Sequence, residues 1–401
     1  MNSLIKTVPN VKKFNDYLFE VKKGTNPIML SGLTDVGKVH MAYSTKFYSE
    51  KPICIITYNE MQAKKIIKDL AYFGEKVKFF PKRDVISFDY VAESKDTLFK
   101  RISVLNKLVK NDKKIIVTTI EAAMQKMITK QSLYKNVMKL KVGDTFDLEE
   151  LKRKLVLLGY ERYDLIEGKG QFSVRGGIVD IATSVNSGVR IEFWGDEIDS
   201  IRKFSLATQR TVKMLDDIDI FPAYEFLLED DVNTVCERIE EKVYPNSVKE
   251  KVKDDVSQIR NGDFLTKIDK YFDCFYKQTD TLLDYLQEDC IIFIDEIAKI
   301  KVRAENITKD NTHLIKDLTE KNKIISRNSY GELALKCRGF PDEVIEKKIT
   351  EEFDVYAGEK GRLDIFCTTE EGALIHLNNY AGMWQRQKVL ERKNENSRSD
   401  L

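Results

Sequence analysis

Four short apolar runs, separated by amphipathic stretches, fall within the first 125 residues of this chain. Each run has the length and composition of a buried strand, and together they cover residues 27–30, 53–57, 77–80 and 114–119. Between them, apolar residues recur at helical spacing, as in residues 60–73. This alternation of strand and helix predicts a doubly wound α/β fold, in which helices flank a parallel sheet.

A glycine-containing loop follows the first of these runs. Residues 32–38 fit the pattern G-x-x-x-x-G-K between a predicted strand and a predicted helix. In a working phosphate loop, backbone N–H groups and the Lys hold phosphates, and a Ser or Thr after the Lys binds Mg²⁺. Val39 stands at that position and cannot bind a metal, while Asp35 adds negative charge to the loop. We therefore expect a vestigial nucleotide site at Gly32, Gly37 and Lys38, with no catalytic residue and no bound metal.

An acidic pair ends a later apolar run, residues 290–294. In nucleotide-hydrolysing folds, an Asp at this place holds Mg²⁺ through water and a neighbouring Glu orients the attacking water. Asp295 and Glu296 fit that description, although an acidic pair at a strand end is also common without such a role. Together with the loop at Gly32, the pair favours descent from phosphate-loop proteins, so we add both residues to the vestigial site.

The pattern changes from about residue 127 onward. Short segments with period-two alternation follow one another, separated by glycine-rich turns; they include residues 138–144, 172–175, 177–181 and 189–194. Such segments are typical of a small β-rich domain. We expect this domain to be inserted into the α/β domain, to end near Ser205, and to be followed by a long, charged helical stretch from Glu225 to about Leu286.

The expected organisation therefore has four parts. Residues 1–126 and 209–345 form the two halves of a RecA/P-loop-like parallel-sheet domain, residues 127–208 form the inserted β-rich domain, and residues 346–401 begin a further small α/β segment with a tail. In that last part, residues 363–367 are predicted to form a strand and residues 370–377 a helix. The fold class is α/β with an inserted α+β unit.

The charge and cysteine content exclude several classes of protein. Lys and Arg number 66 against 65 Asp and Glu, so a net charge of +1 gives no overall attraction to nucleic acid. We expect weak or no DNA binding, because dedicated DNA-binding proteins carry a basic excess. Six scattered cysteines and three histidines form no zinc pattern. No apolar run is long enough for a membrane span or a secretion signal, so we expect the chain to stay in the cytoplasm. Because the cytoplasm is reducing, we expect the cysteines to be free thiols, mostly buried.

A long motif series within the β-rich part resembles a known family. The series runs through Tyr160-Glu161-Arg162, Phe172-Ser173-Val174-Arg175-Gly176 and Arg190-Ile191-Glu192-Phe193-Trp194, then continues to Asp196-Glu197-Ile198 and Ile201. It is similar to the inserted domain shared by UvrB and the transcription-repair coupling factors. The Thr208-Gln209-Arg210 and Pro222-Ala223-Tyr224-Glu225-Phe226 forms are closer to the coupling factors. The resemblance spans roughly residues 25–345.

Two departures separate the chain from UvrB itself. UvrB keeps a Thr after the loop lysine, where this chain has Val39. UvrB also inserts an aromatic hairpin that grips damaged DNA, whereas residues 80–99 form a link too short for that hairpin. The coupling factors lack both features in this region, as this chain does, so the resemblance favours their branch.

In both families the inserted domain docks on UvrA. The resemblance implies that Arg162 and Arg175 make charge-assisted contacts with that partner and that Phe172 belongs to the same surface. A guanidinium suits this role because its fork pairs with a carboxylate in two places. The alternative is that these arginines bind neighbours within the domain, such as Asp164 or Glu167.

The resemblance implies a non-catalytic module that recruits UvrA in transcription-coupled nucleotide excision repair. RNA polymerase and DNA would be partners of the full-length protein, whose polymerase-interaction and motor domains, with their ATP and Mg²⁺, would lie beyond residue 401. The leading alternative is a UvrB-type repair ATPase with a variant phosphate loop, which would need a second motor lobe to supply arginines. A third hypothesis is a DNA-binding architectural protein, and the nearly neutral net charge disfavours it.

Overall fold

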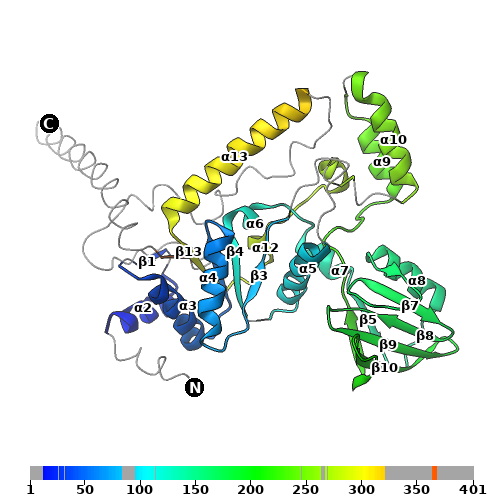
Figure 1. The fold of residues 1–401 in the computed structure, drawn as a ribbon, viewed down its shortest axis with the longest axis horizontal. Coiled ribbons are helices and arrows are strands. Elements are labelled where there is room, and N and C mark those ends of the chain that lie inside the picture. Colours follow the sequence, from blue (N-terminus) through cyan, green and yellow to red (C-terminus); the bar gives the residue numbers. More distant parts are fainter. Residues whose placement is uncertain are drawn as a thin grey trace, which may run out of the picture.

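The computed structural model describes residues 12–25, 27–30, 32–83, 95–112, 114–244, 246–262, 267–268, 270–320 and 364–367. Two sheets dominate this part of the chain. A parallel sheet with helices on both faces lies at one side of the molecule, and an antiparallel unit lies at the other (Figure 1). The α/β class expected from the sequence is thus confirmed, with a separate β-rich unit beside the parallel sheet.

The parallel sheet has six strands in the order β1-β14-β13-β2-β4-β3. All neighbouring strands pair in parallel. The strands are β1 (Ile28–Leu30), β2 (Ile53–Thr57), β3 (Lys78–Phe80), β4 (Ile115–Thr119), β13 (Ile291–Asp295) and β14 (Asp364–Cys367). The first four and β13 match predicted strands. Because β13 pairs with β2, the chain returns to this sheet after forming the antiparallel unit.

Strand β14 differs from its expected place. We expected residues 363–367 to open a further small α/β segment, but β14 lies inside the main sheet, between β1 and β13. Its backbone pairs with both neighbours, Ile365 opposite Ile28 on one side and opposite Phe293 on the other. An apolar pattern predicts that a strand forms but not which strands it pairs with. The sequence therefore could not place β14 within the sheet. The helix expected at residues 370–377 lies outside the described residues.

Alternate residues of the central strands face opposite layers, as a parallel sheet buried on both sides requires. Ile53 and Ile55 pack with α2 (Lys12–Lys23), α3 (Asp35–Ser49) and α4 (Glu60–Ala71). Cys54 and Ile56 face the other layer, which contains α5 (Lys95–Val109), α6 (Ile120–Met124), α12 (Leu282–Tyr285) and α13 (Ile297–Glu320). The result is a three-layer sandwich with one apolar core on each side of the sheet.

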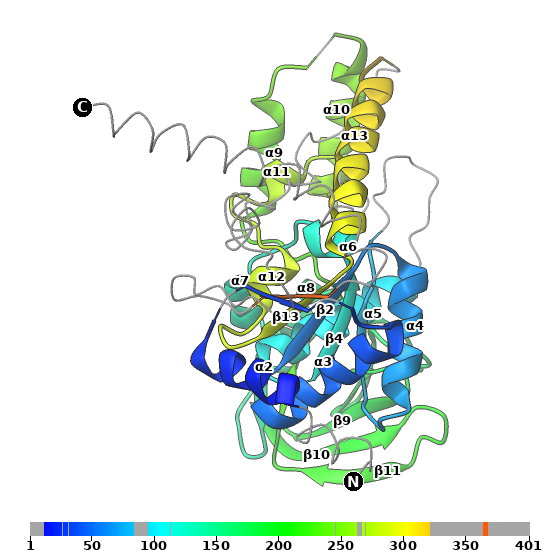
Figure 2. The ribbon, with the colours of Figure 1, turned by 90° about the vertical axis from the view of Figure 1, so that its left-hand side faces the viewer.

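The charged stretch between the two halves is helical but broken. It contains α9 (Val232–Glu240), a 3₁₀ turn η2 (Asn246–Val248), α10 (Lys249–Arg260) and α11 (Phe272–Phe275), before α12. Its aromatic residues Tyr271, Phe272, Phe275 and Tyr276 are buried in the core, as the sequence indicated. In both views α9, α10 and α13 rise from one end of the molecule, away from the antiparallel unit (Figures 1 and 2).

The second unit, called the β unit below, consists of residues 138–226 and is antiparallel except that its edge strand β6 pairs with β7 in parallel. Its main sheet has the order β11-β10-β9-β8-β7-β6. These strands are β6 (Glu161–Arg162), β7 (Gln171–Arg175), β8 (Ile178–Ile181), β9 (Ser187–Trp194), β10 (Glu197–Ser205) and β11 (Thr211–Leu215). A second ribbon pairs β5 (Met138–Lys141) with β12 (Asp217–Ile220), and α8 (Leu148–Leu157) packs on the core. The sheet thus runs past Ser205, where we expected it to end.

A buried polar cluster fixes the point where the chain leaves the β unit. The side chain of Arg101 on α5 donates from Nε to Glu225 at 2.8 and 3.0 Å, and both side chains are fully buried. Nη1 of Arg101 also donates to the Pro81 carbonyl and to Oε1 of Gln125. Because Glu225 follows the last strand of the β unit, this cluster ties the β unit to the parallel-sheet domain.

Cys54, Cys236, Cys274 and Cys290 are free and buried, so the expectation of buried free thiols is confirmed for these four. Among the described helices, none is long and apolar enough to cross a membrane.

Candidate functional site

The phosphate-like loop is closed by its own residues. Gly32 has a φ of +73°, and α3 begins at Asp35, two residues before Gly37. Thr34 caps this helix: its Oγ1 accepts from the N–H of Gly37 at 3.1 Å, and its carbonyl accepts from the N–H of Lys38 at 2.9 Å. Two of the N–H groups that would cradle a phosphate are therefore already bonded within the chain.

Lys38 points at the acidic pair that ends β13. Its Nζ donates to Oδ1 of Asp295 at 2.7 Å and to Oε1 of Glu296 at 2.5 Å. Lys38 is only 5% exposed, and both carboxylates are also buried. The structure thus brings together the vestigial-site residues that the sequence placed far apart, and the single ammonium group of Lys38 is paired with both acids.

The local backbone and pKa shifts fit a preformed ion pair. Glu296 has a φ of +60°, a left-handed conformation that is uncommon for a non-glycine residue. Burial would lower the pKa of Lys38, but the carboxylates of Asp295 and Glu296 outweigh it, so that pKa is raised. Burial raises the pKa of Asp295 despite the opposing effect of Lys38. The ammonium group therefore holds its proton, as the counterion of two buried acids.

Asp35 and Val39 complete the picture of the loop. Asp35 accepts a hydrogen bond from Lys65 at 2.6 Å, and this bond is the main reason why its pKa is lowered. A phosphate bound in this loop would therefore lie close to the negative charge of Asp35. Val39 is buried in the core that α3 shares with the sheet. The valine therefore serves packing, at the position where a metal-binding hydroxyl would stand in a working loop.

The second candidate site is the outer face of the main sheet of the β unit, the face opposite its core. Strand register defines it: Val174, Val179 and Ile191 pair across three strands and face the core, so their neighbours in sequence face outward. Ser173, Asp180, Arg190 and Arg202 form one outward row. Arg175, Ile178, Glu192 and Ser200 form the next.

Arg175 is held at this face by a buried acid. Its Nη2 donates to Oδ2 of Asp180 at 2.9 Å, while Arg190 donates to both oxygens of the same carboxylate at 2.7 and 2.9 Å. Asp180 is 1% exposed, whereas the Arg175 side chain is 53% exposed. One carboxylate therefore orients two guanidinium groups, and most of the Arg175 fork remains open to a partner.

A second charged cluster lies beside the first. Glu192 forms an ion pair with Arg202 and accepts a hydrogen bond from Ser200 at 3.0 Å. The two clusters on the outer face therefore hold three arginines, Arg175, Arg190 and Arg202, and two acids. Sequence reasoning singled out only the first of these. The alternation of polar residues in β9 and β10, and the lone Asp180 in an apolar strand, are the signals that would have revealed the rest.

Two other expected contact residues lie elsewhere. Phe172 is 1% exposed and packs in the core of the β unit, so its assignment to a partner surface is corrected: it supports β7 from the core side. Arg162 is exposed on edge strand β6, and its register partner is Phe172. It therefore shares that residue's side of the sheet, whereas Arg175 falls on the other side. The structure does not unite the two arginines on one face.

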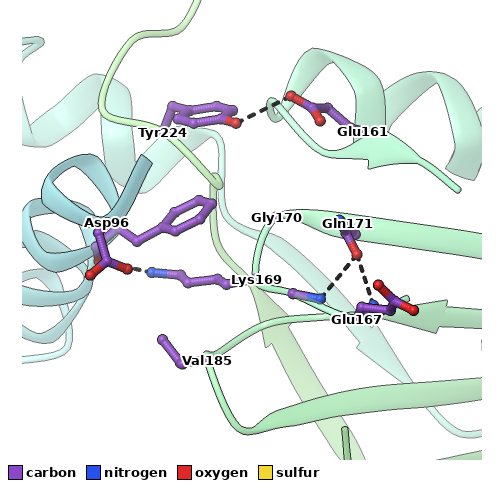
Figure 3. Close-up of a pocket in the computed structure, with 10 residues that line it drawn as sticks. Asp96, Glu161, Glu167, Lys169, Gly170, Gln171, Val185 and Tyr224 are labelled. Carbon is purple, nitrogen blue, oxygen red and sulfur yellow. Dashed lines mark hydrogen bonds between the residues drawn. The ribbon is translucent and has the colours of Figure 1, made fainter. Parts of the chain in front are cut away.

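A pocket of about 270 Å³ lies where the β unit meets α5. Lys169 reaches across this junction and donates to the Phe99 carbonyl at 2.9 Å, while Tyr224 points toward Glu161 (Figure 3). The rings of Phe99 and Tyr224 stack at 5.8 Å. Burial lowers the pKa of Lys169 to about 8. These contacts make the pocket part of the joint between the two halves of the molecule.

Comparison with known proteins identifies the β unit. Residues 138–226 match the family model described as the UvrB interaction domain. A transcription-repair-coupling factor of Bacillus subtilis (strain 168) is 30% identical over 331 residues, which cover 78% of this chain and 28% of that protein. Relatives of the same name from Staphylococcus aureus strains RF122 / ET3-1 and MRSA252 are 28% identical with the same coverage.

The chain thus spans 28% of the length of these curated relatives. The matched domain coincides with the β unit and contains the whole outer face described above. The chain therefore carries a UvrB interaction domain and is related, over most of its own length, to the transcription-repair-coupling factors.

Proposed function

We propose that this chain is a non-catalytic docking module that recruits UvrA in transcription-coupled nucleotide excision repair. The relatives' printed name supports the process, and the name of the matched domain supports a role in the interactions of UvrB-like proteins. RNA polymerase and DNA are proposed as partners of the full-length protein, through segments other than those described. The proposed location is the bacterial cytoplasm, where the DNA and UvrA are found.

The observation that carries this proposal is the arrangement of Arg175 over Asp180. A buried carboxylate holds the guanidinium in place, so little side-chain entropy is lost when a partner binds it. Arginine at an exposed, preorganised position is a frequent source of binding energy at protein interfaces. Arg162 remains a second proposed contact, on the neighbouring edge of the sheet.

The absence of catalysis in this chain is proposed from the closed loop. ATP binding would require Lys38 to leave two buried carboxylates, which would then remain without a counterion. It would also bring phosphates close to Asp35, Asp295 and Glu296. We therefore propose that ATP and Mg²⁺ act only in motor domains of the full-length protein. The same ion pair argues against the alternative of a UvrB-type ATPase with a variant loop.

Calorimetric titration of UvrA with this chain tests the docking proposal. Arg175→Ala is expected to weaken binding by roughly 1–3 kcal/mol, because a charge-assisted contact is lost. Arg153→Ala is the matched control: Arg153 is also an exposed arginine of the β unit, but it lies on α8, which covers the core side of the sheet. Equal affinities for wild type and Arg175→Ala, or no binding of UvrA by the wild type, would overturn the proposal.

A second titration tests the nucleotide claim. Wild-type chain is expected to show no Mg²⁺-dependent ATP binding in the micromolar range. Lys38→Met serves as the comparison, because it removes the residue that would have to move. Micromolar, Mg²⁺-dependent binding that Lys38→Met abolishes would restore the ATPase alternative.

A further inference from the structure

Three lysines meet at the amino-terminal edge of the parallel sheet, where its strands begin. Lys78 is the first residue of β3, Lys114 immediately precedes β4, and Lys107 lies in the last turn of α5, which packs against β3 (Figure 1). These three residues are called the lysine cluster below. Because parallel strands all run the same way, this edge is opposite the one that holds Lys38 and Asp295.

The backbone brings the three lysines together. Strand register places Lys78 opposite Ile116, two residues after Lys114. The chain turns tightly after α5, where the N–H of Asp112 donates to the Lys107 carbonyl at 3.0 Å, so Lys114 returns close to the end of that helix. The side chains of Lys78 and Lys107 lie within hydrogen-bond distance of each other, and the charge of Lys114 is close enough to act on Lys107.

The lysine cluster holds more positive charge than the nearby acids balance. Lys114 forms an ion pair with Asp112 at 3.1 Å. Within the described residues, neither Lys78 nor Lys107 forms an ion pair with a carboxylate, although all three lysines are half-buried. Burial and the ammonium groups of Lys78 and Lys114 lower the pKa of Lys107 to about 8. Two neighbouring lysines therefore share one region without a counterion from the chain.

An anion would remove this unfavourable arrangement. A lysine ammonium group has three donors and no acceptor, so two charged lysines repel each other and cannot bond directly. An anion placed between them accepts hydrogen bonds from both, and such charge-assisted bonds are strong. A phosphate group is tetrahedral and doubly charged, so it can accept from three converging lysines. A planar, singly charged carboxylate offers less charge to the same donors.

We propose that the lysine cluster of Lys78, Lys107 and Lys114 is a binding site for the phosphate group of a small molecule, such as inorganic phosphate or pyrophosphate. A small ligand is favoured over a nucleic-acid backbone because the lysines are half-buried and the net charge of the chain is only +1. The site is separate from the outer face of the β unit and does not depend on UvrA docking.

Calorimetric titration with pyrophosphate tests this site. Lys107→Met and Lys78→Met are each expected to weaken binding by about tenfold or more, because each removes a charge-assisted hydrogen bond. Lys110→Met is the matched control. Lys110 lies one turn from Lys107 but is already paired with Asp219 at 3.0 Å, so this variant should bind pyrophosphate as wild type does.

Thermal unfolding gives a second measurement that stays informative if a variant has lower basal stability. Pyrophosphate should raise the unfolding temperature of wild type and of Lys110→Met, because a ligand that binds only the folded state stabilises it. The rise should be lost in Lys107→Met and Lys78→Met. Sodium chloride at matched ionic strength should not reproduce the rise, which separates binding from general screening of the lysines.

Failure of wild type to bind pyrophosphate, or equal binding by wild type and the two cluster variants, would overturn the proposal. A short DNA duplex provides the remaining comparison. Duplex binding that requires Lys107, without pyrophosphate binding, would assign the phosphate to a nucleic-acid backbone and overturn the small-molecule site. Arg175→Ala should bind pyrophosphate as wild type does, so the result is independent of the UvrA titration.

Discussion

The ammonium group of Lys38 lies 2.7 Å from Oδ1 of Asp295, although 257 residues separate the two in sequence. Together with Glu296, the pair joins the start of α3 to the end of β13 at the carboxyl edge of the parallel sheet. In a nucleotide-binding fold this edge receives the ligand. Here an internal salt bridge occupies it, so its residues stabilise the fold.

Lys38→Met should therefore destabilise the protein by about 3–5 kcal/mol, because two buried carboxylates lose their counterion. Chemical denaturation of both proteins measures the difference. Lys64→Met is the control: the Lys64–Glu60 pair is exposed and should contribute less than about 1 kcal/mol. Equal losses for the two variants would show that the Lys38 pair contributes no more than a surface pair.

The deficit of Lys38→Met should also depend on pH. Burial raises the pKa of Asp295 in the folded protein. The free-energy cost of its buried negative charge is therefore present above that pKa, and it is relieved as the pH falls toward the ordinary value of 3.8. The raised pKa of Lys38 makes its own contribution complete at neutral pH, with loss only as the pH rises through that pKa. The stability difference between wild type and variant should thus shrink in acid. A constant difference between pH 7 and 4 would contradict this account.

Glu225→Gln tests the cluster that ties the β unit to α5. The change keeps the shape of the side chain but leaves the fully buried Arg101 without its carboxylate. We expect a loss of about 3–5 kcal/mol in the free energy of unfolding. The control is Glu240→Gln, because Glu240 and its partner Arg260 are both exposed. This substitution should lower the free energy of unfolding by less than about 1 kcal/mol. A loss at Glu225 as small as that at Glu240 would mean that Arg101 finds other compensation.

The strands and the acidic pair were predictable from the sequence for a physical reason. A strand buried on both faces must be apolar throughout, so β2, β4 and β13 stand out as continuous apolar runs. The carboxyl ends of parallel strands meet at one edge, so a loop after β1 and an acidic pair after β13 can be expected to meet. The helix α8 was also open to detection, since Asp147 caps it and Leu151 and Leu155 follow at helical spacing.

Other features could not be read from the sequence. Strand β11 is exposed on both faces except at the half-buried Leu215, so it has no continuous apolar run that marks it as a buried strand, and the predicted end of the β unit fell short of it. The partner of Arg101 lies 124 residues away, and no spacing rule connects them. Phe172 looked like a contact residue because it stands in a conspicuous motif next to Arg175, and only the register shows that it faces the core.

Lys169 should make the stability of the domain junction depend on pH. Its pKa falls from 10.5 to about 8 in the folded protein because of burial. The cost of burying its charge is therefore present below pH 8, and stability recovers as the pH rises from 8 toward 10.5. The same pocket is lined by the acids Asp96, Glu161 and Glu167. Wild type must therefore be compared with a variant that keeps these three residues and changes only Lys169.

Lys169→Met is that variant, because it keeps the length of the side chain and removes the charge. We expect its unfolding free energy at pH 7 to match or exceed that of wild type, by up to about 3 kcal/mol, with the advantage shrinking between pH 8 and 10. Denaturant titrations at pH 7 and 10 measure this. An advantage that grows with pH would contradict the lowered pKa.

Gly177→Ala should disturb the end of the β unit on which the proposed docking surface depends. The added Cβ would lie 2.8 Å from the Phe193 carbonyl oxygen, so the hairpin carrying Arg175 must move away from β9. We expect a loss of about 1–3 kcal/mol in stability, together with weaker UvrA binding. Gly168→Ala is a close control, because a Cβ there meets only the Gln171 side chain, at 4.0 Å. If Gly177→Ala binds UvrA as well as Gly168→Ala does, docking does not require the close approach of the two hairpins.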